Sequence, residues 1–274
     1  MKSISANEHE AIRIVPLHIP KPSTTISDLK KKSDDEDLFN VVSKIAATPN
    51  LIYNGGPLIQ NVDVFTIFWG ANWAKTPSYI SLARDINNFF STILTGSLID
   101  QLAEYNTKTP AYAIGHGTLN GTQTIAVSAP ASGKSIKDSA IQKALKGWIA
   151  SKAVPSANAN RLYFIYTDIN VKVIMGGSAS CTSFCGYHNN IGSTYYAVMP
   201  FPSCTGCLGG LSAMDALTGT SSHELCEAIT DPVPGTGWYD QTNGEIGDIC
   251  AWKFKTLAGY NVQLEWSNKE GKCV

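Results

Sequence analysis

The sequence predicts an α/β (α+β) protein in which helices pack on a mixed β-sheet. Two observations support this class. Strand-like and helix-like segments alternate from residue 51 to residue 167, and both kinds recur in the C-terminal part. The chain has 274 residues, 43% of them hydrophobic, which is enough for one large domain or two small ones. We expect one domain over 51–274, preceded by an arm over 1–50.

The N-terminal arm is poor in order signals. Three prolines precede a basic block over 30–32 and an acidic block over 34–37. Opposite charge blocks are typical of a solvated segment, with one short helix near 35–47. A pro-segment, a brace across the domain and a flexible tail all fit this composition. The first 30 residues also lack the apolar core of a signal peptide.

The elements of the domain follow from hydrophobic periodicity. Apolar runs and alternation predict strands over 62–69, 111–114, 122–128, 161–167, 195–199 and 261–266. Apolar residues recurring every three to four positions predict helices over 78–95 and 137–152, with a shorter helix over 97–105 between them.

A further helix is expected to begin near Ala213. Ser212 and Asp215 fit the S-x-x-D capping box that starts helices, and Pro232 limits the helix at its other end. Gly219 and the polar run after it leave room for a break. In either version, residues 223–227 are helical.

This helix carries an H-E-x-x-E pattern, one letter from the H-E-x-x-H of zinc hydrolases. His223 and Glu227 are four residues apart and so share one helix face, where both could bind one zinc ion. Glu224 would lie beside them as the general base, which makes the helix zincin-like. The alternative is a solvated helix face with a satisfied histidine.

Acidic residues downstream complete the predicted zinc site. Glu245 would be the third ligand and Asp248 would orient the site, although the sequence does not separate these roles. A calcium site built from Asp231, Glu245, Asp248 and carbonyl groups is the alternative, because oxygen ligands suit calcium.

Two other histidines are candidates for a role in the site. His188 follows Cys185, where a crosslinked loop could hold it as a transition-state stabiliser or an extra ligand. His116 lies in a glycine-flanked turn and is the weaker candidate.

Seven cysteines suggest disulfide-braced loops and an oxidising compartment. We expect the pairs Cys181–Cys185, Cys204–Cys207 and Cys250–Cys273. Cys226 then remains as a small buried residue on the helix, away from the face of His223 and Glu227. A four-cysteine zinc site is the alternative for the first two pairs, since the spacing resembles that of structural zinc sites.

Composition limits the partners. The net charge of −1 gives no basic surplus for nucleic acid or an anionic membrane, and no apolar run is long enough to span a bilayer. The remaining partners are a peptide or protein substrate, or a cell-wall glycan. Sugar stacking would use exposed aromatic residues, for which the candidates are Trp69, Trp73, Trp238 and Tyr239.

Several sequence blocks occur in one order. They are residues 53–57, 61–69, 185–188, 204–207, 222–228, 238–239 and 245–250, followed by Cys273. In this order they resemble the phosphate-induced, EXORDIUM-like family, over roughly 50–274. That family is extracellular in plants, is linked to cell growth and has relatives in microbes. The resemblance implies secretion and the cysteine pairing above, but no established enzymatic activity.

The residues therefore favour a secreted zinc-dependent hydrolase, most simply a metallopeptidase. His223, Glu227 and Glu245 would hold zinc, with Asp248, Glu224 and His188 in support. The alternative is a non-catalytic extracellular signalling or wall-binding protein with a structural zinc or calcium ion.

Overall fold

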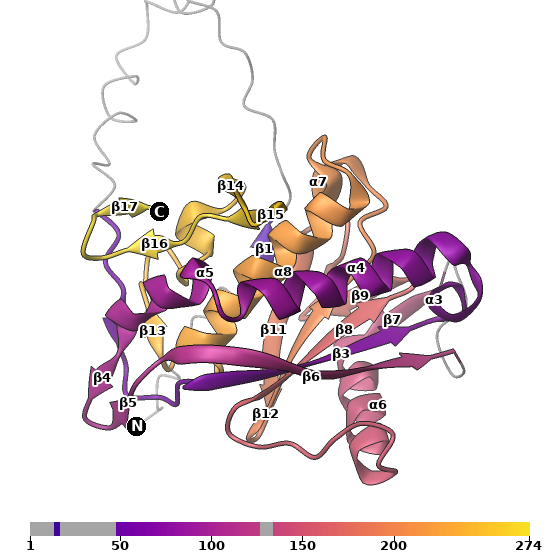
Figure 1. Cartoon of the computed structure of the whole chain (residues 1–274), viewed down its shortest axis with the longest axis horizontal. Coiled ribbons are helices and arrows are strands. Elements are labelled where there is room, and N and C mark those ends of the chain that lie inside the picture. The colour runs from indigo at the N-terminus through magenta and orange to yellow at the C-terminus, as the bar shows by residue number, and fades with distance from the viewer. Residues whose placement is uncertain (1–13, 17–47, 127–133) are drawn as a thin grey trace, which may run out of the picture.

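The computed structural model describes residues 14–16, 48–126 and 134–274. Its centre is a mixed six-stranded sheet (Figure 1). The strand order is β1 (Ile14–Pro16), β11 (Phe184–Ile191), β12 (Thr194–Met199), β8 (Arg161–Thr167), β3 (Asn61–Trp69) and β6 (Gly115–Ile125). The strands from β12 to β6 are parallel, whereas β11 and β1 run antiparallel to their neighbours. The predicted class, helices packed on a mixed sheet, is confirmed.

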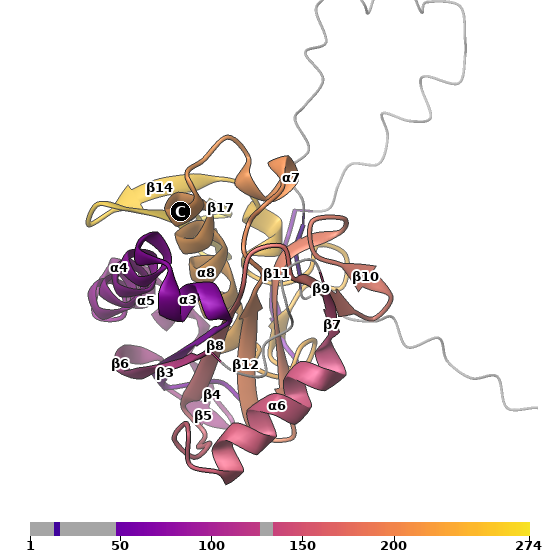
Figure 2. The same ribbon diagram turned by 90° about the vertical axis from the view of Figure 1, so that its right-hand side faces the viewer.

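Helices cover both faces of this sheet (Figure 2). One face carries α4 (Pro77–Ile93), α5 (Ser97–Asp100) and α8 (Ala213–Thr230), and α6 (Asp138–Ala150) lies on the opposite face. The side chains of β3 alternate accordingly: Val64 and Phe68 join the core under α4 and α8, while Phe65 and Ile67 join the core under α6. Burial on both faces explains why the central strands read as continuous apolar runs.

Shorter elements complete the described chain. They are β2 (Ile52–Tyr53), α3 (Ala71–Lys75), the 3-10 helix η1 (Gln101–Tyr105), β4 (Thr107–Lys108), β5 (Ala111–Tyr112), β7 (Ser135–Lys137), β9 (Lys172–Met175), β10 (Ser178–Ala179), α7 (Thr205–Leu208), β13 (Trp238–Tyr239), the 3-10 helix η2 (Asp248–Cys250), β14 (Phe254–Leu257), β15 (Tyr260–Gln263), β16 (Trp266–Ser267) and β17 (Lys272–Cys273).

The predicted elements are present in the described chain, with shifts of boundary. The strand expected over 111–114 is the two-residue strand β5, which pairs with β4 outside the main sheet. Residues 127–128 of the strand expected over 122–128 lie outside the described residues. The helix expected over 97–105 is α5 followed by η1, and the strand expected over 261–266 is broken between β15 and β16. The strand expected to begin at residue 122 begins at Gly115 as β6. This strand forms an edge of the sheet and alternates polar, exposed residues with mostly half-buried ones, so its apolar signal is weak.

Part of the predicted N-terminal arm belongs to the sheet. Residues 14–16 form β1, Val15 is buried, and the carbonyl of Pro16 accepts a 2.8 Å hydrogen bond from the Trp252 indole. These residues brace the free edge of β11. The helix expected near 35–47 lies outside the described residues.

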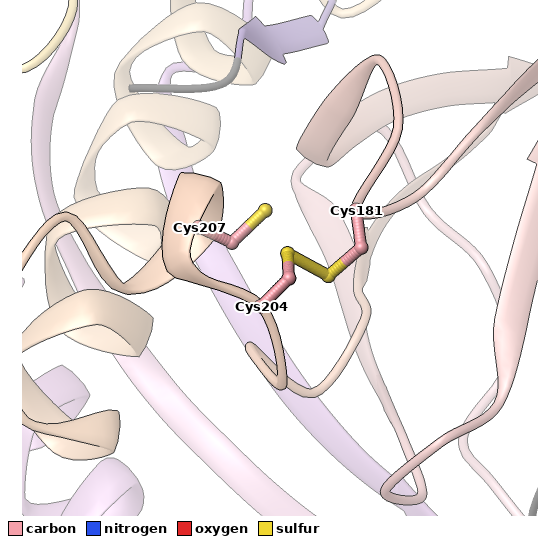
Figure 3. A group of neighbouring side chains, drawn as sticks. All are labelled: Cys181, Cys204 and Cys207. Atoms are coloured by element: carbon pink, nitrogen blue, oxygen red, sulfur yellow. A yellow bond between two sulfur atoms is a disulfide. The ribbon is translucent and has the colours of Figure 1, made fainter. Parts of the chain in front are cut away.

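Three disulfides are present, but two of the predicted pairings are wrong. The observed bonds are Cys181–Cys204, Cys185–Cys207 and Cys250–Cys273. Figure 3 shows Cys181 bonded to Cys204, with Cys207 beside them. Bonded sulfurs are not thiolates, so the alternative four-cysteine zinc site is excluded too. Cys226 is free and buried, as predicted.

The first two bonds attach α7 to β11 and to the segment before it. The third attaches η2 to β17. Each bond thus holds an element that lies next to the helix α8 or carries a predicted site residue.

Replacing Cys250 and Cys273 by serine should lower the free energy of unfolding by about 3 kcal/mol, because the bond closes a loop between residues 23 apart. The cost can be measured by denaturant unfolding. Cys226→Ala is the matched control, since this thiol crosslinks nothing. An equal loss in both variants would contradict the crosslink explanation.

The aromatic residues expected to stack on sugars are mostly interior. Trp69, Trp73 and Tyr239 are buried, and Trp238 is half-buried with its indole N–H donating to the carbonyl of Tyr105. That expectation is wrong for the three buried residues, because their rings pack in the core. None of the helices in the described part of the chain combines the length and apolar character needed to cross a bilayer.

Candidate metal centre

The predicted active-site helix is an unbroken, buried helix. The Ser212 hydroxyl accepts a 3.1 Å hydrogen bond from the Asp215 amide, which confirms the predicted cap, and the helix passes through Gly219 without a break. Every residue from Ala216 to Thr230 is buried. The helix packs against β11, β12, β15 and α4. The H-E-x-x-E residues therefore lie in the interior, and the alternative of a solvated helix face is wrong.

His223 and Glu227 form the first group of this site together with Asp248. The His223 Nε2 atom lies 2.8 Å from Glu227 Oε1 and 3.9 Å from Asp248 Oδ1. The Asp248 amide donates to the same Glu227 oxygen at 3.1 Å, which holds η2 against the helix. Yet neither ring nitrogen of His223 makes an aligned hydrogen bond among the described residues. Close atoms that are not aligned with each other can instead face a common ion.

His188 brings together a second group. Its Nδ1 atom lies 3.0 Å from Glu224 Oε2 and 3.5 Å from Glu227 Oε2. On the other side of the ring, Nε2 lies 3.5 Å from Glu245 Oε1 and 3.1 Å from the carbonyl oxygen of Asp231. The structure thus places His188 beside Glu224 and Glu227. Glu245 contacts His188, and Asp248 takes the place beside His223 that was expected for Glu245.

The cluster has a large excess of buried acid. The side chains of Glu224, Glu227 and Glu245 are fully buried, and that of Asp248 is only 6% exposed. Within the described chain, Glu224 Oε1, Glu227 Oε2 and both oxygens of Glu245 are buried without a hydrogen-bond partner. Burying a charge without compensation is strongly unfavourable. A cation at the centre would supply that compensation.

The pKa values reflect this unbalanced charge. Burial raises the pKa of Glu224, and burial with the neighbouring Glu227 charge raises the pKa of Glu245 and Asp248 well above the usual range. Glu227 differs: burial opposes its ionisation, but His223 and His188 outweigh it and lower its pKa to about 2.

Both histidines respond in the opposite direction. Burial lowers the pKa of His188, but the nearby carboxylates of Glu224 and Glu227 outweigh it and raise the pKa to about 10. The Glu227 carboxylate likewise raises the pKa of His223 well above its usual value, against the effect of burial. Protons on these rings partly balance the acids, and metal binding would displace a proton from each ligating nitrogen.

Asp231 does not fit the role of a calcium ligand. Its carboxylate accepts hydrogen bonds from the amides of Gly235, Thr236 and Gly237, so it braces the loop that follows α8. The predicted all-oxygen site of Asp231, Glu245 and Asp248 is therefore incomplete. Imidazole nitrogens in both groups suit zinc better than calcium.

Two residues of the site, Glu265 and Gly247, are not predicted as site residues from the sequence. Glu265 is fully buried with neither oxygen hydrogen-bonded in the described chain, and its strongest charge interaction is with His223. Polar and apolar residues alternate over 262–266, which is the pattern of a strand with one solvent-facing side. The sequence therefore indicates an exposed Glu265 and gives no sign that it is buried at the site. Gly247 packs closely against the His223 ring and the Glu227 carboxylate. A Cβ atom at this position would lie 2.8 Å from His223 Nδ1 and 2.9 Å from Glu227 Oε1.

Gly247→Ala should weaken metal binding at least about tenfold, comparable to loss of a supporting contact. Its φ of −79° suits alanine, so the effect would come from displaced ligands and not from backbone strain. Zinc titration by calorimetry measures it. Gly147→Ala is the control, since a Cβ there meets no atom within 4 Å. Unchanged zinc affinity in Gly247→Ala would contradict this packing argument.

The fold and site together define an α/β protein with a buried histidine–carboxylate cluster. Comparison of the chain with protein-family models finds no match. Comparison with curated proteins finds none either.

Proposed function

We propose that the protein is a zinc-dependent hydrolase, and specifically a metallopeptidase. One observation carries this proposal: ligand atoms of His223, Glu227 and Asp248 lie within 4.8 Å of one another in the interior, and neither ring nitrogen of His223 has an aligned hydrogen bond among the described residues. Imidazole nitrogen and carboxylate oxygen are both zinc donors, and three protein ligands leave a fourth position for water or substrate. Zinc in such a site acts as a Lewis acid and lowers the pKa of water to about 7.

Glu224 has the properties of the general base. It follows His223 on the helix, its Oε1 atom has no hydrogen-bond partner in the described chain, and burial raises its pKa toward the working pH. A raised carboxyl pKa suits proton transfer near neutral pH. His188 holds the other oxygen of Glu224 at 3.0 Å and so fixes the direction in which Oε1 points. We assign His188 as the positioning residue for this base.

An extracellular location is part of the proposal. Three disulfides brace the described chain, and such bonds persist in oxidising compartments. The ordered sequence blocks support membership of the EXORDIUM-like family, which implies secretion. Peptide or protein is the substrate class that the H-E-x-x-E arrangement favours.

One observation favours a second candidate function. The side chains of His223, Glu224, Glu227 and Glu245 are 0% exposed. Closed sites are typical of structural metals, whereas a catalytic site must admit water and substrate. The alternative is therefore a non-catalytic extracellular signalling or wall-binding protein, with cell-wall glycan as its partner.

Hydrolysis of an unfolded protein substrate separates these two functions. The zinc-loaded full chain should cleave the substrate, lose activity on treatment with a chelator, and regain it when zinc is restored. Elemental analysis must be done on the same sample. Bound zinc without cleavage, together with a chelator effect limited to the melting temperature, would support the structural-metal function.

A further inference from the structure

We propose that the cluster holds a second divalent cation, bound by His188, Glu245 and Glu227, with the Glu227 carboxylate bridging the two metals. The inference rests on the proposed zinc site at His223 and extends it. Zinc, or another divalent cation that accepts mixed nitrogen and oxygen ligands, is the ligand class.

The orientation of Glu227 is the first observation. Its Oε1 atom lies 2.8 Å from His223 Nε2, while its Oε2 atom lies 3.5 Å from His188 Nδ1. The ligand atoms of His188, Glu227 and Glu245 lie within 4.8 Å of one another, close enough to hold one ion. The Glu227 side chain thus presents one oxygen to each histidine. Oε1 also accepts the Asp248 amide, but Oε2 is buried with no hydrogen-bond partner in the described chain. A carboxylate placed between two imidazoles in this way is suited to bridge two ions.

Glu245 provides the second, independent observation. It is fully buried, and neither of its oxygens has a hydrogen-bond partner among the residues described. Its Oε1 atom lies 3.5 Å from His188 Nε2. The first zinc ion would be bound by Asp248 beside His223. It would therefore not account for the buried, unpartnered carboxylate of Glu245. A second cation between Glu245, His188 and Glu227 would satisfy these oxygens.

Further ligands are close to the same position. The main-chain oxygen of Asp231 lies 3.1 Å from His188 Nε2, at the end of the helix α8. Carbonyl oxygen is an acceptable ligand for a divalent cation. The Nδ1 atom of His188 would then keep its hydrogen bond to Glu224, as metal-binding histidines commonly do with a carboxylate.

Charge supports two ions over one. Glu224, Glu227, Glu245 and Asp248 are four acids against two imidazoles, and Glu265 adds a fifth buried acid near His223. One divalent ion beside His223 and Asp248 leaves the buried carboxylate of Glu245 without a cation next to it. A second ion balances it at the place where the unpartnered oxygens lie.

Zinc stoichiometry in matched variants tests the inference. The full chain and the variants Glu245→Gln, Asp248→Asn and Glu227→Gln would be loaded with zinc, desalted and measured by elemental analysis. We expect two zinc ions in the wild type, one in Glu245→Gln, one in Asp248→Asn, and at most one weakly held ion in Glu227→Gln. Exposed Glu270→Gln is the control and should keep two.

One zinc ion in the wild type that Asp248→Asn removes and Glu245→Gln leaves would overturn the second position but leave the proposed function intact. No zinc in the wild type would overturn both. Should a variant fail to fold, as judged by circular dichroism, the wild-type count alone still decides between one ion and two.

Discussion

Glu224→Gln should reduce kcat for hydrolysis by a factor of about 10² to 10⁴, the range that a general base contributes. Glutamine keeps the shape of the side chain and its contact with His188 but cannot accept a proton from water. Because Glu224 is not one of the three proposed ligands, the variant should keep its zinc. Steady-state kinetics on a peptide substrate and elemental analysis of the same preparation measure both quantities.

Glu104→Gln is a useful control for this experiment. Glu104 lies in η1 and accepts hydrogen bonds from the Ser267 hydroxyl and the Asn268 amide, and it belongs to neither proposed metal group. Its replacement should leave kcat unchanged. If Glu224→Gln retained full activity with zinc bound, Glu224 could not be the base and the mechanism would be wrong.

His223→Ala should remove most of the stabilisation that the zinc ion proposed at His223 gives to the fold. A ligand at a thousand times its Kd stabilises a protein by about 4 kcal/mol, which for a chain of this size corresponds to a rise in Tm of roughly 10 °C. Without the imidazole, the remaining carboxylates should bind zinc at least about 100-fold more weakly, exceeding the loss for a supporting residue. Thermal melts with and without added zinc measure the difference.

The control for this variant is His116→Ala. His116 is exposed, and its Nε2 atom lies 2.8 Å from Asp100 Oδ1. This pair is therefore a place where zinc could bind at the surface instead of in the cluster. The control should melt like the wild type in zinc. A zinc-dependent rise in Tm that survives in His223→Ala but disappears in His116→Ala would place the metal at the surface instead.

The sequence was sufficient for the local part of this site. Spacing of four residues places His223 and Glu227 on one face of any helix, and Ser212 with Asp215 marks where the helix starts. The apolar runs of the central strands likewise follow from burial on both faces. These features depend on neighbours in the chain, which a sequence displays directly.

The remaining features depend on long-range packing. Six cysteines allow 15 pairings, and only the position of α7 beside β11 selects Cys181–Cys204 and Cys185–Cys207. Glu245 lies beside His188, whereas Asp248 lies beside His223. Which acid meets which histidine depends on the path of the loop around Gly247. Glu265 lies in the break between β15 and β16, and its burial near His223 depends on how that segment packs.

Anomalous X-ray diffraction at the zinc edge, on crystals of the zinc-loaded protein, tests the central claim most directly. We expect a peak about 2.0–2.2 Å from His223 Nε2 and from carboxylate oxygens of Glu227 and Asp248. A crystal with no peak inside the cluster, or with zinc only at surface residues such as His116 and Asp100, would show that the cluster is not a metal centre.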